Sequence, residues 1–368
     1  PAQCLLEIES QIGTIKQELM GVLPSIVALV APLLFSLSAA SAQDTLENYI
    51  REYPNQEQVR MMQRWLETNE PGTFQFTGLV DPTDDTVITP QATVNYGYNW
   101  FSLSEGPAII RTPQYERFFS VSIFDMKHNV PGVIVNPEVP ILLYRPGQTL
   151  PEGDFNRVML ETDQGLAFTR MVVVDNLDEV MALSHEIVME GGIGDMGRDV
   201  QRFSPEVEAA ALKLIEAAVP LVDTDKVFGT VSGDTGEIHL AAGVFQGQLG
   251  TPSHVVRYGL LAVNEDGEPF NGEDTYVLTV PAGIVKPEGY FSVTLYGTDN
   301  KLLIPNEAGR YDRTSYTSEP NADGTTTVTL SPSGEGLNGI PTGKPFYGIL
   351  RSYMPLPGAD TTVKVETK

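Results

Sequence analysis

The sequence predicts a mainly β fold, a sandwich or a barrel, with helical segments at its start and in its middle. After Thr73, short runs rich in β-branched and aromatic residues recur, and turn-forming pairs such as Asp81-Pro82 and Pro146-Gly147 separate them. Glycine (34 residues) and proline (27 residues) are numerous, as expected where tight turns join short strands. The chain has 368 residues, which is long for one domain and sufficient for two.

The expected strands fall into two groups, one in each half of the chain. The first group is TFQFTGLV (73–80), ATVNYGYNWFSL (92–103), AIIRT (108–112), RFFSVSIF (117–124), ILLYR (141–145), RVMLE (157–161) and FTRMVVVD (168–175). The second group is TYVLTV (275–280), GYFSVTLY (289–296), KLLI (301–304), TTTVTL (325–330) and FYGILRSY (346–353). Many strands at short spacing are typical of sandwiches and barrels, and not of alternating strand–helix folds.

A first helix is expected within residues 44–70. Asn55 has the character of an N-cap, and Val59, Met62 and Leu66 fall on one helical face.

Residues 176–220 are expected to be helical as well. Asn176 is the predicted cap of a first helix that puts Val180 and Val188 on one face and ends at Gly191-Gly192. Ser204-Pro205 starts the next helix, and strands are expected to resume after Leu221.

These elements divide the chain into a helical segment over 43–72, a β domain over 73–175, a helical linker over 176–220 and a second β domain over 221–368.

Met20–Ala42 has the pattern of a secretory signal peptide. Its core, Val22–Leu37, carries no charge, and Ala40-Ser41-Ala42 offers small residues where a signal peptidase cleaves. We therefore expect a mature protein that begins at Gln43 and works in a periplasm or outside the cell, with Pro1–Leu19 as an upstream segment.

An uncleaved membrane anchor is the alternative. Two prolines, Pro24 and Pro32, interrupt the apolar run, and the run is shorter than the roughly 20 apolar residues that a spanning helix needs. Cleavage is therefore favoured, and no stable membrane anchor is expected in the mature protein.

The charge and the cysteine content exclude several classes of function. The formal net charge is −25, which repels nucleic acid and anionic lipid headgroups, so no nucleic-acid partner is expected. Cys4 is the only cysteine and precedes the signal, so the mature chain has no disulfide and no thiolate ligand or nucleophile.

Asp125 and His128 form the first candidate site. They follow the expected strand RFFSVSIF, and a turn there would bring a carboxylate to an imidazole. Such a carboxylate orients the ring and favours its charged form, as in many general bases and metal ligands. The alternative is a turn-stabilising aspartate beside a surface histidine.

No cofactor and no metal are expected. The four histidines have no spacing typical of a metal site. Gly192 to Gly197 matches the dinucleotide-binding pattern G-x-G-x-x-G, but the match follows a helix instead of a strand, which argues against dinucleotide binding.

Two further groups are candidates for ligand binding. Tyr96, Tyr98 and Trp100 share one strand face, which suits either stacking on a flat ligand or packing in a core. Arg310-Tyr311 and Arg351 would form a polar cluster beside Asn338, for binding or for architecture.

The C-terminal third carries motifs that resemble the domain-of-unknown-function family numbered 1214. They are Asn271-Gly272, Tyr276-Val277-Leu278, Pro281-Ala282-Gly283, Tyr290 to Tyr296, Arg310-Tyr311, Asn338-Gly339-Ile340-Pro341 and Leu350 to Pro355. The family usually has tryptophan at the position of Gly339.

Motifs upstream resemble the companion family numbered 1254. They are Trp100 to Leu103, Gly106-Pro107, Thr112-Pro113, Arg117-Phe118-Phe119 and Phe124-Asp125. The two resemblances cover about residues 90–357. They imply two jelly-roll-like β-sandwich domains in an often exported bacterial protein, and they imply no established reaction.

Two functions are therefore expected, in order of preference. The first is an exported β-sandwich protein that binds a small-molecule or protein partner or assembles in the envelope, with a homo-oligomer left open. The second is an exported hydrolase or lyase that acts on a polar or carbohydrate-like substrate. The candidate binding residues are Trp100, Asp125, His128, Arg310 and Tyr311.

Overall fold

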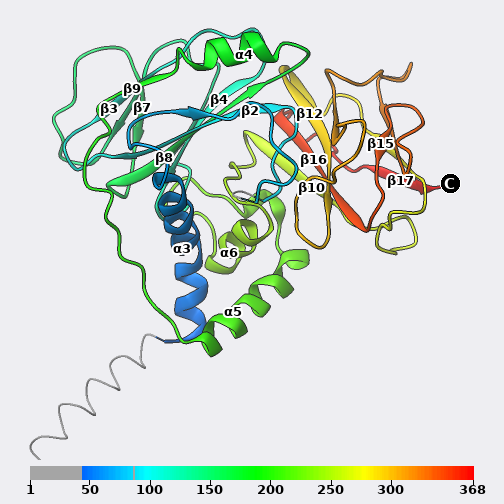
Figure 1. Ribbon diagram of the computed structural model, residues 1–368, viewed down its shortest axis with the longest axis horizontal. Coiled ribbons are helices and arrows are strands. Elements are labelled where there is room, and N and C mark those ends of the chain that lie inside the picture. The colour runs from blue at the N-terminus through cyan, green and yellow to red at the C-terminus, as the bar shows by residue number, and fades with distance from the viewer. Residues whose placement is uncertain (1–43, 86–87) are drawn as a thin grey trace, which may run out of the picture.

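The computed structural model describes residues 44–85 and 88–368. Two β-sandwiches lie side by side, and a group of helices packs beneath them (Figure 1). The predicted mainly β chain, with two sandwich-like domains, an N-terminal helix and helices between the domains, is confirmed.

The first sandwich consists of two sheets. One sheet, here called the inner sheet of this domain, has the spatial order β1 (Gln75–Phe76), β2 (Val94–Ser102), β8 (Gln164–Val172), β4 (Phe119–Asp125) and β5 (Gly132–Val135). The other has the order β7 (Asn156–Met159), β6 (Ile141–Tyr144), β3 (Ala108–Arg111) and β9 (Val188–Glu190). Apolar side chains fill the space between the two sheets, among them Phe101, Val121 and Ile141. A helix, α4 (Leu177–Ser184), connects β8 to β9.

The second sandwich also has two sheets. Its inner sheet has the order β10 (Val256–Leu261), β16 (Phe346–Pro355), β12 (Val285–Gly297) and β13 (Asp312–Thr314). Its outer sheet has the order β15 (Ile340–Pro341), β14 (Thr326–Ser331), β11 (Tyr276–Val280) and β17 (Lys364–Thr367). Leu278, Val293 and Phe346 belong to the core between these sheets.

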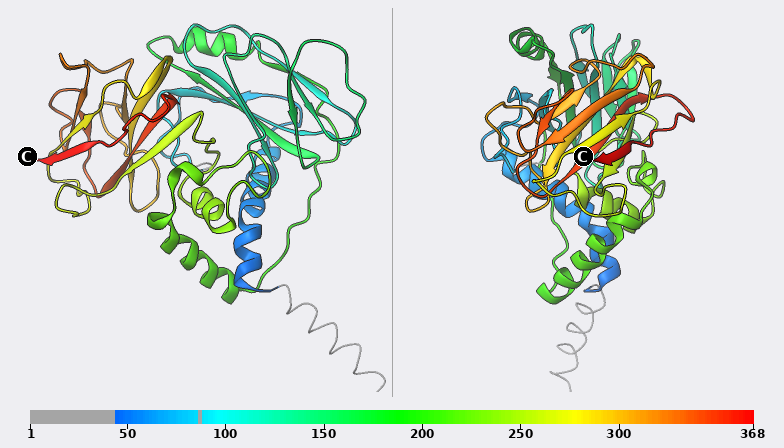
Figure 2. Two further views of the ribbon diagram at one scale, coloured as in Figure 1. Left: turned by 180° about the vertical axis from the view of Figure 1, so that it is seen from behind. Right: turned by 90° about the vertical axis from the view of Figure 1, so that its right-hand side faces the viewer.

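Three helices and two short 3-10 turns form the third part of the molecule. They are α3 (Leu46–Leu66), α5 (Pro205–Ala218), η2 (Val219–Leu221), η3 (Thr224–Lys226) and α6 (Glu237–Gln246). Tyr49 and Tyr53 of α3 belong to one apolar cluster with Ile215 of α5 and Val244 of α6. The views in Figure 2 place this helical group along one side of both sandwiches.

The central strands of both inner sheets are buried on both faces. Along β8, Ala167 and Met171 face the core of the first sandwich, whereas Leu166 and Phe168 face the second domain. Along β16, Leu350 faces its own core, and the alternate residues face the first domain. Side chains alternate between the faces of a strand, so each inner sheet presents a second apolar face to the other domain. A second core, which contains Tyr96, Phe168, Tyr290 and Tyr353, joins the two sandwiches.

Four local predictions are wrong. The N-terminal helix begins at Leu46 with Thr45 as its cap, whose Oγ1 accepts from the backbone N–H of Asn48 at 3.2 Å, and Asn55 lies inside the helix. The helix predicted to end at Gly191-Gly192 ends at Ser184.

The physical reason for that early end is strand pairing. Val188–Glu190 pairs with β3, which supplies its backbone hydrogen bonds, and Ile187 packs into the first core. The third wrong prediction concerns residues 301–304, which form only an isolated bridge between Leu303 and Tyr296. The fourth wrong prediction concerns the residues after Leu221. Strands were expected to resume there, but helix α6 comes first.

The predicted signal at Met20–Ala42, the anchor weighed against it and the cleavage point before Gln43 lie outside the described residues. Within residues 44–85 and 88–368, no helix has the length and apolarity that crossing a membrane requires.

Candidate functional site

Asp125 stabilises the turn that follows β4. Its carboxylate, 1% exposed, accepts hydrogen bonds from the backbone N–H groups of Lys127 at 2.8 Å and Asn129 at 2.9 Å, and from the Asn129 side-chain amide at 2.8 Å. Burial raises the pKa of Asp125, and the bonds from Asn129 and Lys127 offset part of that rise. The Asp125 carboxylate therefore stabilises the turn to which it belongs.

His128 occupies the same turn but its side chain has different partners. The residue is fully buried with φ at +66°, and its Nε2 accepts the backbone N–H of Leu249 at 3.2 Å. Its ring stacks on Phe228 with centroids 6.1 Å apart. Burial lowers the pKa of His128 to about 3, so the expectation that Asp125 favours the charged imidazole is wrong.

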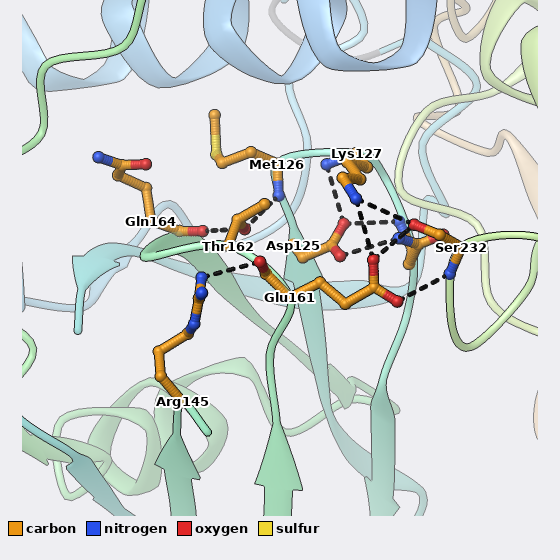
Figure 3. Close-up of polar contacts among 9 residues, drawn as sticks. Asp125, Met126, Lys127, Arg145, Glu161, Thr162, Gln164 and Ser232 are labelled. Atoms are coloured by element: carbon orange, nitrogen blue, oxygen red, sulfur yellow. Dashed lines mark hydrogen bonds and ion pairs between the residues drawn. The ribbon is translucent and has the colours of Figure 1, made fainter. Parts of the chain in front are cut away.

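A polar network fastens the loop around Ser232 onto this turn (Figure 3). Glu161 accepts the Ser232 backbone N–H at 3.0 Å and the Ser232 hydroxyl at 2.5 Å. Lys127 donates to the same carboxylate at 3.1 Å. The hydroxyl bond from Ser232 is the main cause that lowers the pKa of Glu161. The backbone N–H and the hydroxyl of Ser232 both bond to Glu161. The network therefore attaches the loop around Ser232 to the first sandwich.

The other predicted residues lie apart from this turn. Trp100 is buried in the interdomain core, and Arg310 donates to the backbone carbonyl of Gly334 at 3.2 Å. Tyr311 packs against a small cluster that contains Tyr296 and Tyr347. The structure thus does not bring Trp100, Arg310 and the Asp125–His128 turn into one pocket. None of the five candidates lines either of the two cavities described next.

A cavity of about 110 Å³, here called the interdomain cavity, lies between the domains. Its wall comes from β2 and β8 of the first inner sheet, β10 and β16 of the second, and the segment from Val219 to Gly250. Its aromatic lining consists of Tyr96, Tyr98, Phe168, Phe228, Tyr258 and Tyr353. A smaller group of polar side chains, including Arg170 and Arg351, completes it. Ligand sites commonly combine an apolar wall with a few polar groups in this way.

Arg170 lies on β8 with 7% of its surface exposed. Its guanidinium donates to the Ser122 hydroxyl at 2.8 Å and to the backbone carbonyl of Leu249. The guanidinium also lies 4.3 Å from the centroid of the Phe168 ring. All of these partners are neutral.

Arg351 lies on β16 with 5% of its surface exposed. It donates to the Tyr296 hydroxyl at 2.7 Å, to the Thr89 carbonyl at 2.7 Å and to the Gln91 amide oxygen at 3.4 Å. In the described part of the chain, neither Arg351 nor Arg170 has a carboxylate oxygen within 4.0 Å.

His128 lies directly behind the interdomain cavity. Its Nε2 accepts a hydrogen bond from the backbone N–H of Leu249, and Arg170 donates to the backbone carbonyl of the same residue. Leu249 has φ at +58°. Phe228, which stacks on His128, lines the cavity. The Asp125–His128 turn therefore supports the cavity wall from outside.

A second cavity of about 120 Å³ adjoins the first and shares Pro90 and Tyr98 with it. Trp65, Asp81 and Asp84 contribute to its lining. Among the residues that the structure describes, no group of three or more histidine, cysteine, aspartate or glutamate side chains could hold a metal ion.

Sequence reasoning identified Tyr96 and Tyr98 as one strand face but missed Arg170, Phe228 and the role of Arg351 in a cavity. One signal was present: each arginine is the single charged residue of its strand, β8 (QGLAFTRMV) or β16 (FYGILRSYMP). A charged residue at a position that faces a core indicates either a buried partner or a functional site.

Comparison with known proteins finds matches to two described families, one in each half of the chain. Residues 71–190 match the family described as protein of unknown function (DUF1254), and residues 256–357 match the family described as protein of unknown function (DUF1214). No curated protein matches the sequence.

Two solved structures share the fold over most of the chain. The VPA0106 protein from Vibrio parahaemolyticus has a TM-score of 0.68 at 18% identity, over 87% of this chain and 98% of that one. An uncharacterized protein from Burkholderia cenocepacia has a TM-score of 0.50 at 12% identity, over 86% of this chain and 87% of that one. At these identities the likeness concerns the fold alone. The chain therefore joins an N-terminal DUF1254 region to a C-terminal DUF1214 region, and the resemblance that its motifs carry is confirmed.

Proposed function

We propose that this protein binds a small, largely apolar molecule in the interdomain cavity. The observation that carries the proposal is the lining of that cavity, in which six aromatic side chains from both domains and the helical segment surround one space. The volume of about 110 Å³ is below that of an engineered cavity of about 150 Å³ that binds benzene, so the expected buried part of the ligand is no larger than a single ring.

The proposed site lies where the doubly buried inner sheets of the two domains meet. Each sandwich already has its own core, and the faces of β2, β8 and β16 that point away from those cores meet around the cavity. Asp125 and His128, on which the alternative of a hydrolase or lyase depended, do not line this space and bond to separate partners, Asn129 and the backbone of Leu249. Ligand binding is therefore the function that the geometry supports best.

Neutral benzene derivatives test the proposal. We expect benzamide, benzyl alcohol or benzonitrile to bind the wild-type protein in isothermal titration calorimetry and to raise its melting temperature. Replacing Ala242, a buried cavity residue on α6, with phenylalanine should fill the space and abolish that binding. The same substitution at Ala210, which is exposed on α5, is the matched control and should leave binding unchanged.

Circular dichroism should show that both variants are folded. If the wild type binds none of the three compounds, or if Ala242→Phe binds them as well as Ala210→Phe does, the cavity is not a ligand site and the proposal is wrong.

We also propose that the protein is exported. The support is the apolar run Val22–Leu37 followed by Ala40-Ser41-Ala42, together with a single cysteine, Cys4, that lies upstream of it. N-terminal sequencing of the protein from its native source should give Gln43 as the first residue. A membrane-bound form that retains Met20 would contradict this proposal.

A further inference from the structure

We infer that the ligand of the interdomain cavity carries an anionic group, a carboxylate in the simplest case, which Arg170 and Arg351 bind. This inference rests on the proposed ligand-binding function and adds the chemical class of the ligand. Arg170 and Arg351 line the same cavity although they come from different domains.

Both guanidinium groups retain donors after their bonds within the protein are counted. A guanidinium has five N–H donors. Arg170 uses two of them, on a hydroxyl and a carbonyl. Arg351 bonds to a hydroxyl, a carbonyl and an amide oxygen. Among the described residues, at least two N–H groups on each arginine are therefore left over, and none of the acceptors carries a charge.

Within residues 44–85 and 88–368, these two arginines have no carboxylate partner although the protein is strongly acidic. The sequence has 48 aspartate and glutamate residues against 23 lysine and arginine residues. Exposed arginines such as Arg51, Arg60 and Arg64 each pair with a neighbouring carboxylate. Arg170 and Arg351 are more deeply buried, where an uncompensated charge costs most. A ligand carboxylate would supply the missing counter-charge.

Groups already present compensate these charges only in part. The rings of Phe168 and Tyr296 lie 4.3 Å and 5.6 Å from the two guanidinium carbons and attract them weakly. The charge of Arg351 lowers the pKa of Asp312. The Asp312 carboxylate, however, accepts its hydrogen bonds from Gln91 and Thr93 and not from Arg351. Burial still raises the pKa of Asp312 to about 7, so near neutral pH it carries only part of a negative charge.

The aromatic lining defines the rest of the ligand. Tyr98, Phe168 and Phe228 offer ring faces and edges to an apolar body, while the arginines accept its charged end. A planar carboxylate matches the fork of a guanidinium with two parallel hydrogen bonds. Small aromatic or aliphatic monocarboxylates therefore combine the two features that the cavity offers.

Benzoate and benzamide test the inference because they have nearly the same shape and differ in charge. In calorimetric titrations near neutral pH, we expect the wild type to bind benzoate at least about tenfold more tightly than benzamide. Arg170→Gln and Arg351→Gln should each reduce that preference to about threefold or less while benzamide still binds. Arg257→Gln is the matched control, because Arg257 lies on β10 next to a cavity residue but pairs with Asp225 and does not line the cavity.

The outcomes separate the inference from the proposed function. Equal affinity of the wild type for benzoate and benzamide, or binding of neutral compounds alone, would overturn the inference and leave the ligand-binding function standing. No binding of benzoate or of any of the three neutral compounds would overturn both. A benzoate preference that survives in both arginine variants would also overturn the inference. If a variant fails to fold, a crystal of the wild type soaked with 4-bromobenzoate decides: the bromine should lie among the aromatic rings with the carboxylate on an arginine, and any other position refutes the inference.

Discussion

Replacing Asp312 with asparagine is expected to raise the free energy of unfolding by about 4 kcal/mol at pH 8 and to change it little at pH 4. Asp312 is 5% exposed, and burial raises its pKa to about 7, against about 3.9 in an unfolded chain. Above pH 7 the folded protein must hold a buried carboxylate, which destabilises it. Below pH 7 the folded state takes up a proton that the unfolded state does not, so stability from this group rises as the pH falls toward 4.

The measurement is urea unfolding of the wild type and Asp312→Asn at pH 4 and pH 8. Asparagine retains an oxygen that can accept from Gln91 and Thr93, which donate to Asp312 at 3.1 Å each. Asp312→Ala is the control, because it removes the charge and also leaves those donors without an acceptor. An equal gain for Asp312→Asn at both pH values, or a loss at pH 8, would show that Asp312 is not a strained buried carboxylate.

The strands were largely predictable because their signal is local. Alternation of side chains and the turn residues between them depend on neighbours in sequence, and β2, β4, β11, β12, β14 and β16 all lie within or around the expected runs. The helices were harder. Val188 fits the face of a helix by periodicity, yet it pairs with β3, which lies far away in the sequence. Such tertiary pairing overrides local preference.

The N-cap of the first helix was misplaced for a related reason. Pro54 normally interrupts a helix, which favours a start at Asn55. In the structure Pro54 lies inside α3, where Tyr49, Tyr53, Val59 and Met62 are buried on both sides of it. Burial of these side chains offsets the cost of the proline, and that burial depends on α5, α6 and the first inner sheet.

The site could be predicted only in part because it combines residues from distant segments. Asp125 and His128 were chosen as polar residues next to each other in sequence, and their partners turned out to be the turn itself and Leu249. Arg170 and Arg351 share a cavity only because two sandwiches pack through their inner sheets. No pattern within either strand carries that information.

His128 is expected to lower the free energy of unfolding as the pH falls, whereas Asp312 raises it. An unfolded histidine takes up a proton near pH 6.5, whereas burial lowers the pKa of His128 to about 3 in the folded protein. The stability that this group contributes is therefore complete above about pH 6.5 and is lost as the pH falls toward 3. Between pH 7 and pH 5 the loss is about 2 kcal/mol.

In the wild type this loss and the gain from Asp312 nearly cancel over that range, so single variants are needed to separate them. His128→Gln removes the titrating ring, and its side-chain oxygen can still accept from the N–H of Leu249. Its unfolding free energy should fall about 2 kcal/mol less than that of the wild type between pH 7 and pH 5. His254→Gln, at an exposed position, is the control. If His128→Gln and the wild type lose the same stability, His128 is protonated in the folded state, and it cannot be the buried neutral group that holds Leu249 at the wall of the interdomain cavity.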